Sequence, residues 1–172
     1  MESDDKPGLK KQIEAIRSNN RTAILATLSD LRSGGHVSIL HELLNLLLIS
    51  EDEEIRSGIT SLLNDLKEQE AAEILAKSIA DPGFLDIQTI LVAACWQNGL
   101  VYGEYISTFV DVVISGNYIT AIEAFTVIEE AIGEVEEKQR KKLVTKLKAS
   151  ISELDNEKQA LIAELVKVID TY

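Results

Sequence analysis

A polar turn followed by a long apolar helix recurs along this chain, and that recurrence constrains the fold more than any other feature of the sequence. EDEEIR at 51–56, DPGFLD at 81–86 and SGNYIT at 115–120 each place about four polar or turn-forming residues before an apolar residue and a long apolar segment. Weaker copies begin near residues 18–20 and 155–156. Helix starts expected at about 20, 52, 84, 117 and 156 therefore recur every 32–39 residues. That period is typical of two-helix units stacked on one another.

The spacing of apolar residues predicts ten helices and no strands. The breaks between them carry residues that stop or cap helices, among them SGG at 33–35 and Asp81-Pro82-Gly83. Central segments are apolar most of the way round, whereas the first and last are two-sided, as expected where neighbours bury both flanks of a central helix. The predicted helices span residues 8–18, 20–32, 36–49, 52–67, 69–80, 84–98, 101–115, 117–132, 134–150 and 156–171.

The turns and the residues after them resemble the signature of HEAT repeats, a family of stacked helix pairs. Ile55-Arg56 matches the apolar-arginine pair that opens the second helix of a repeat, and Asp81-Pro82 matches the turn before it. The resemblance implies an all-α, right-handed α-solenoid of about five antiparallel helix hairpins (HEAT-like), whose second helices line a concave side and hold other proteins. We expect Arg56 to be structural and to pair with an acidic residue, either at a turn, such as Asp52, or across the repeat boundary.

The length of 172 residues suits one domain. We expect a disordered N-terminal tail over residues 1–7, MESDDKP, and a single helical repeat domain over residues 8–172. The tail lacks the basic-then-apolar order of a secretory signal. The longest apolar runs, 46–49 and 90–96, are far shorter than the ~20 residues that cross a bilayer. The sequence therefore predicts a cytoplasmic protein that does not bind a membrane.

The net charge of −12 is concentrated in the middle of the chain. Residues 1–50 carry six basic and six acidic side chains, and residues 134–172 carry eight of each. Residues 51–80 carry 3 basic and 8 acidic side chains, and residues 81–133 carry 0 and 7. Because a negative field repels phosphate backbones, we expect no nucleic-acid partner. A basic or neutral protein or peptide suits this charge better.

The basic stretch KQRKKLVTKLK at 138–148 is interpreted as a solvated helix. Acidic residues precede its cations, which matches the helix macrodipole. Glu134 with Lys138 and Glu137 with Lys141 also have the favourable i,i+4 order.

We find no catalytic, cofactor or metal signature in the sequence. Cys95 is the single cysteine, so neither an internal disulfide nor a cysteine metal cluster is possible. It lies in an apolar helix, which is typical of a buried thiol. No nucleophile, base and orienting group come together. We therefore expect a protein that is not an enzyme and needs no cofactor.

Seven of the eight aromatic residues lie between residues 84 and 125, a segment without any Lys or Arg. We expect the phenylalanines to fill the core and two tyrosines near Gly99 and Gly103 to be exposed anchors at the rim of a contact surface. The predicted function is a protein-protein interaction scaffold or adaptor that uses an acidic, aromatic-containing surface of the central repeats. The predicted contact residues are Asp86, Gln97, Tyr102, Tyr105, Thr120, Glu123 and Glu130.

Two other functions stay open at this point. Helix 156–171 ends in VIDTY without a polar extension, so an end repeat could pair with its copy in a homodimer. A nucleic-acid-processing or modifying enzyme built on a HEAT-like solenoid would need a positive inner face. The helices expected to line that face are acidic, which favours the scaffold.

Overall fold

The computed structural model describes residues 7–32 and 37–172, which form ten α-helices and no strands. The predicted tail, residues 1–7, lies outside the described residues except for Pro7, and so does the SGG break at 33–35. All ten predicted helices are confirmed, and their bounds differ by at most three residues once short 3-10 helices are counted. The helices are α1 (Pro7–Arg17), α2 (Arg21–Leu31), α3 (Leu40–Ile49), α4 (Glu53–Asn64), α5 (Glu70–Ala80), α6 (Gln88–Asn98), α7 (Ile106–Ser115), α8 (Tyr118–Ala131), α9 (Glu137–Ser150) and α10 (Asn156–Asp170).

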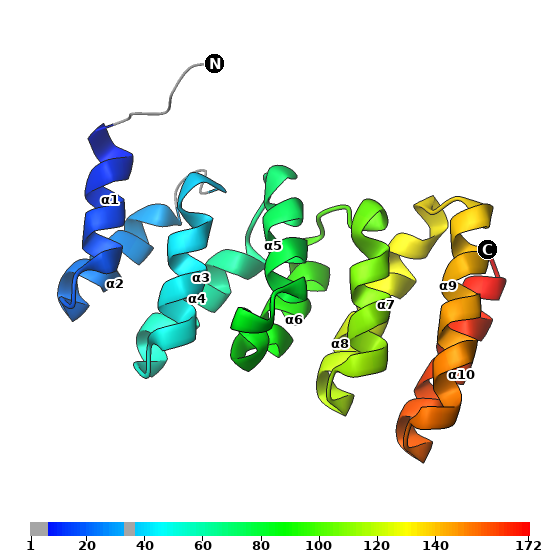
Figure 1. The fold of residues 1–172 in the computed structure, drawn as a ribbon. Helices are drawn as coiled ribbons and strands as arrows, with labels where there is room; N and C mark the ends of the chain where they lie inside the picture. The colour runs from blue at the N-terminus through cyan, green and yellow to red at the C-terminus, as the bar shows by residue number, and fades with distance from the viewer. Residues whose placement is uncertain (1–6, 33–36) are drawn as a thin grey trace.

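The helices form two layers that run side by side from the N-terminus to the C-terminus (Figure 1). The odd-numbered helices α1, α3, α5, α7 and α9 occupy the front layer, and each contacts the next one. The even-numbered helices lie behind them and also contact one another in succession. Each odd-numbered helix contacts the even-numbered helix that follows it. The all-α prediction is therefore confirmed, with every helix packed both on its partner in sequence and on its neighbours in the layer.

The start of every second-layer helix, or of the 3-10 helix that leads into it, is capped by an Asn or Asp side chain. The side-chain oxygen accepts hydrogen bonds from backbone N–H groups of the first turn, which have no partner within the helix. Replacing such a cap with Ala costs about 1 kcal/mol. All five caps lie within three residues of the helix starts predicted above. They are Asn20, Asp52, Asp81, Asn117 and Asp155.

One apolar core extends through the molecule from Ile16 to Ile169. The Phe109 ring is fully buried, as predicted for the phenylalanines, whereas Phe84 and Phe125 are partly buried and pack against the edge of the core. Several alanines in the core are also fully buried, so neighbouring helices approach one another closely. These are Ala71, Ala72, Ala94, Ala121 and Ala124.

Several of the hydrogen bonds between successive helix pairs join side chains that are 31–33 positions apart in sequence. This separation matches the period of the recurring turns, so equivalent positions of neighbouring pairs contact each other. Three of these bonds link Arg21 with Asp52 at 2.7 Å, Asn64 with Gln97 at 2.7 Å and Thr89 with Thr120 at 2.5 Å.

Arg56 has a structural role, but the predicted pairing with Asp52 is wrong. The Nη1 group of Arg56 donates to the carbonyl oxygens of Leu47 at 2.6 Å and Ser50 at 3.1 Å. These carbonyls lie at the C-terminal end of α3, where they lack intrahelical partners and where the helix dipole is negative. Asp52 instead accepts a hydrogen bond from Arg21 of the preceding pair.

Candidate partner-binding surface

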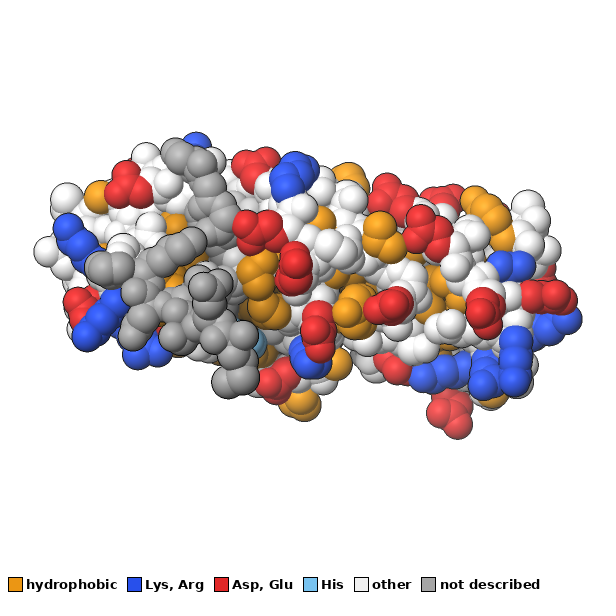
Figure 2. All heavy atoms as spheres, turned by 90° about the horizontal axis from the view of Figure 1, so that it is seen from above, with side chains coloured by type: hydrophobic (Ala, Val, Ile, Leu, Met, Phe, Trp, Pro, Cys, Tyr) orange, Lys and Arg blue, Asp and Glu red, His pale blue; other side chains and the backbone are white. Residues whose placement is uncertain are grey.

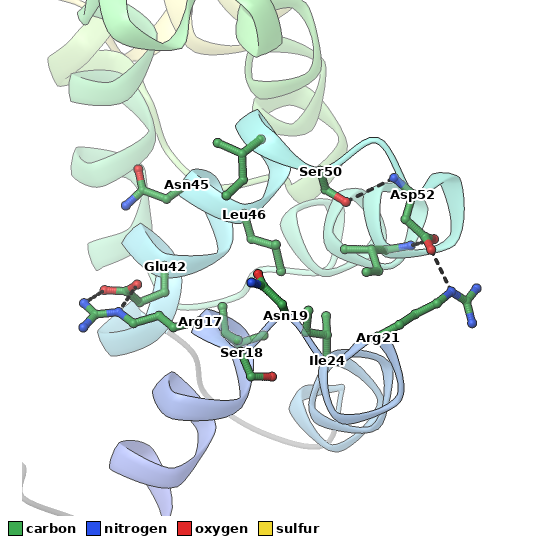
Figure 3. A pocket seen from close by; sticks show the side chains of 13 residues that line it. Arg17, Ser18, Asn19, Arg21, Ile24, Glu42, Asn45, Leu46, Ser50 and Asp52 are labelled. Atoms are coloured by element: carbon green, nitrogen blue, oxygen red, sulfur yellow. Dashed lines mark hydrogen bonds and ion pairs between the residues drawn. The ribbon is translucent and has the colours of Figure 1, made fainter.

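A groove of about 370 Å³ lies between the first two helix pairs, where the turn after α1 meets the turn after α3 (Figure 3). Ile16, Ile24 and Ile55 are buried and give it an apolar floor, while its rim is polar. Its volume falls within the range of small-molecule pockets. We call it the N-terminal groove, and it is lined by Ile16, Arg17, Ser18, Asn19, Arg21, Ile24, Glu42, Asn45, Leu46, Ile49, Ser50, Asp52 and Ile55.

The charged side chains of the N-terminal groove are paired with one another. Arg17 donates through Nε and Nη2 to the two carboxylate oxygens of Glu42, at 2.8 and 2.6 Å. On the other side of the groove Arg21 bonds to Asp52 at 2.7 Å (Figure 3), and it also bonds to Glu54. The hydrogen bond from Arg17 lowers the pKa of Glu42, and the hydrogen bond from Arg21 lowers the pKa of Asp52. The rim therefore holds acid-base pairs that already satisfy each other's charge.

A second surface lies on α6 and α8 in the even-numbered layer. Of the eight large apolar side chains that are exposed among the described residues, four lie here. Trp96 is 37% exposed, and Ile119 is 65% exposed. The indole Nε1 of Trp96 donates to Oε2 of Glu123 at 2.6 Å, which joins the two helices. Ile119 lies four residues before Glu123 and three before Ile122, so its side chain neighbours both of them on the helix surface. We call this set the central surface: Trp96, Gln97, Tyr118, Ile119, Ile122 and Glu123.

The central surface lacks basic side chains of its own. Neither α6 nor α8 contains Lys or Arg, although Lys67 from the preceding pair reaches the carbonyl oxygen of Asn98 at the end of α6. Glu129, Glu130 and Glu134 are exposed, and none of them has a hydrogen-bond or ion-pair partner within the described part of the chain. Seen from above, acidic side chains spread along the molecule while most basic ones lie toward its two ends (Figure 2).

Four of the predicted contact residues have polar groups at the surface. Glu123 is half-buried, Gln97 is exposed, and both belong to the central surface. Gln97 accepts a hydrogen bond from Asn64. Glu130 is exposed near the end of α8. Asp86 is also exposed, but it lies in the 3-10 helix Pro82–Ile87, before α6, and is not part of the central surface.

The predictions for Tyr102 and Thr120 as surface contacts are wrong. Tyr102 is 2% exposed, and its ring packs edge-on against Phe109 with the ring centroids 5.5 Å apart. Its hydroxyl accepts a hydrogen bond from Asn98 Nδ2 at 3.1 Å. Thr120 is 1% exposed, because its hydroxyl faces α6. Tyr105 is half-buried against the core rather than a free anchor.

Sequence reasoning missed Trp96, Ile119 and Ile122. The predicted face of α8 passed through position 120, whereas the exposed face begins one residue earlier and passes through 119, 122 and 123. The composition of α8 could have indicated the two isoleucines, because the helix has more apolar residues than one buried face can hold, so some of them must be exposed. Trp96 lies beside Gln97, which was predicted correctly to be exposed.

A smaller cleft of about 190 Å³ lies where the C-terminal ends of α6 and α8 meet. Burial raises the pKa of the Cys95 thiol at its floor to about 12. The thiol is therefore protonated and unreactive near neutral pH. We call this hollow the central cleft, and it is lined by Cys95, Gly99, Leu100, Val101, Tyr102, Val127, Glu130, Ala131 and Glu134.

The basic stretch on α9 is partly engaged within the protein. The predicted pair of Glu137 and Lys141 is confirmed, and Lys146 pairs with Asp111 of α7. Glu134, the other predicted partner, lies in the 3-10 helix Ile132–Glu134 before α9 begins. These contacts agree with a solvated helix that bonds to its neighbour.

Within residues 7–32 and 37–172, no group of three His, Cys, Asp or Glu side chains is arranged to hold a metal ion. No single helix in the same part of the chain is long and apolar enough to cross a membrane, and the one pair that passes by composition, Glu70–Ala80 with Pro82–Asn98, is bent by 103°. No protein family model, curated protein or solved structure matches the sequence or the fold. Function is therefore inferred from the surfaces described above.

Proposed function

We propose that this chain is a HEAT-like, right-handed α-solenoid of five helix hairpins that acts as a non-enzymatic scaffold for another protein. Three features support the repeat architecture: the two parallel rows of helices, the Asn or Asp cap before every second-layer helix, and the hydrogen bonds that join residues 31–33 apart. Neighbouring repeats would then share their apolar flanks, which a single hairpin lacks the surface to bury.

The exposed apolar side chains of the central surface carry the proposal of a protein partner. Ile119 and Ile122 are exposed one turn apart on α8, and the exposed Trp96 of α6 is joined to the same helix by its bond to Glu123. Contiguous exposed apolar groups of this kind are typical of protein interaction sites. Trp is also enriched among the residues that dominate binding energy. A partner would gain by covering these groups, because they are in contact with water when the chain is alone.

The unpaired carboxylates around the central surface indicate a basic or neutral partner. Because exposed charges are screened within ~8 Å at physiological ionic strength, binding should weaken as salt is added. Phosphate backbones and anionic membranes would be repelled by the same charges.

Self-association through an end of the molecule receives less support from the structure. The exposed positions of α10 are mostly polar and include Glu157, Glu164, Lys167 and Asp170. The exposed positions of α1 include Lys10, so the helices at both ends expose polar faces rather than an apolar stripe.

The experiment is affinity capture from the native lysate with three forms of the protein. The wild type is compared with the double variant Ile119→Asp, Ile122→Asp and with the control Ile49→Asp. Ile49 is 75% exposed and lines the N-terminal groove, so the control replaces one exposed isoleucine with aspartate away from the central surface. We expect specific partners to be retained by the wild type and the control and lost by the double variant. Two results would contradict the proposal. One is that all three forms retain the same partners equally, and the other is that the wild type captures no partner even at low salt.

A further inference from the structure

The central cleft combines apolar walls with carboxylates at its mouth. Val127 and Ala131 of α8 form one wall, and Leu100 forms part of the other. The chain reverses at Gly99, whose φ of 69° is a left-handed conformation that glycine adopts without strain. This reversal brings the segment after α6 back over the end of α8. The cleft is therefore a built hollow between two helix ends.

Two carboxylates lie at the cleft and lack partners. Glu130 is in the last turn of α8, and Glu134 lies four residues later in the 3-10 helix Ile132–Glu134. A Cβ atom built on Gly103 would lie 3.8 Å from Cβ of Glu134 and 3.9 Å from its Oε2 atom, so Glu134 sits directly over the returning segment. Like charges at this spacing repel each other. A cation between them would relieve that repulsion.

The floor of the cleft is neutral. Tyr102 is buried, and its hydroxyl is bonded to Asn98, while the Cys95 thiol donates to the carbonyl oxygen of Leu91 at 3.2 Å. Negative charge is thus confined to the rim, and the interior offers apolar contact. This arrangement matches a long side chain with a methylene stem and a cationic head.

We propose that the central cleft binds a lysine or arginine side chain of the protein partner. The proposal rests on the proposed scaffold function, and it names the anchor by which a basic segment is held. The methylene stem would pack against Leu100, Val127 and Ala131, and the charged head would lie between Glu130 and Glu134. An aliphatic side chain would fill the same space but leave both carboxylates unpaired, and an acidic side chain would be repelled by them.

The test uses small probes that carry only the anchor. Nα-acetyl-arginine amide and Nα-acetyl-lysine amide are titrated into the isotope-labelled full chain, with Nα-acetyl-citrulline amide as the neutral isostere of arginine. We expect amide chemical shifts to move at Leu100, Val101 and Ala131 with the two cationic probes. The citrulline probe should bind at least about tenfold more weakly, because it lacks the charge that both carboxylates attract.

Variants separate the cleft from general attraction to an acidic protein. Glu130→Gln and Glu134→Gln should each weaken the arginine probe about threefold to fivefold, as expected for an exposed ion pair. Glu129→Gln removes an adjacent exposed charge that does not line the cleft, so affinity should change by less than about twofold.

Three results would overturn the cleft proposal: no localised shift with either cationic probe, equal binding of citrulline, or equal loss with Glu129→Gln. Each leaves the scaffold proposal intact if captured partners still depend on Ile119 and Ile122. Conversely, if capture fails while the probes bind as expected, the scaffold proposal is lost and only the side-chain site stands.

Discussion

The N-terminal groove and the central surface both lie where neighbouring helix pairs meet, but their charged groups have different partners. In the groove, Arg17 and Arg21 cross from the first pair to carboxylates of the second. At the boundary that carries the central surface, the third and fourth pairs are joined by uncharged groups, such as the indole of Trp96 and, beneath the surface, the hydroxyls of Thr89 and Thr120. Nearby carboxylates are left without internal cations.

This difference shows how one architecture can neutralise charge at one boundary and leave it free at another. Exposed ion pairs between neighbouring helix pairs satisfy each other's charge and leave little to attract a partner, and because they are exposed they add little stability. Where the boundary is closed by neutral hydrogen bonds and apolar packing, the acidic side chains at its surface stay free. At the boundary between the third and fourth pairs the carboxylates stay free because there is no Lys or Arg between Ser78 and Glu137.

The largest expected effect on stability is at the neutral boundary. Thr120→Val removes a buried hydroxyl and leaves the Thr89 hydroxyl without that partner, so the free energy of unfolding should fall by about 1–2 kcal/mol. Urea denaturation measures it. Arg17→Met, which breaks an ion pair whose arginine side chain is 67% exposed, should cost clearly less. A larger loss for Arg17→Met than for Thr120→Val would reverse the proposed contrast.

A smaller effect should appear in the pH dependence of stability, and it should come from the N-terminal groove. Arginine neighbours lower the pKa of Glu42 and Asp52 in the folded state. Their stabilisation is therefore fully present above the carboxyl pKa of the unfolded chain, about 4, and is lost as pH falls through the lower folded values.

Thermal unfolding between pH 6 and pH 2 tests this assignment. The wild type should lose melting temperature in the acid range, and Arg17→Met with Arg21→Met should show a shallower loss. Glu129→Gln with Glu130→Gln, which removes carboxylates without cation partners, should not flatten the curve. A profile that only the second pair of changes flattens would contradict the assignment.

The sequence was sufficient to predict where the helices lie, but it was not sufficient to predict which of their side chains are exposed. Turn residues such as Asp52, Asn117 and Gly99 act locally, so their positions in the sequence identify where helices begin and end. The exposed face of α8 depends on how α6 and α7 lie against it, which no local pattern contains. The observed exposed face of α8 differs from the predicted one by one residue, so Thr120 is buried and Ile119 is exposed.

The prediction that Tyr102 is exposed was wrong for a related reason. Glycines on both sides favoured an exposed ring, but the left-handed turn at Gly99 directs the following segment back onto the core, where the ring meets Phe109. The acidic character of the region was predictable because it depends on composition alone. The sequence did not predict which carboxylates lack a cation partner, because such pairs can join distant residues, as Arg21 and Asp52 do across 31 positions.

Hydrogen-deuterium exchange on the complex with a captured partner compares the two regions in one measurement. If the central surface is the binding site, amides of α6 and α8 and the segment between Gly99 and Tyr105 become slower to exchange, while those around the N-terminal groove do not change. Slower exchange confined to the ends of α1 and α3, with α6 and α8 unaffected, would contradict this assignment of the binding site.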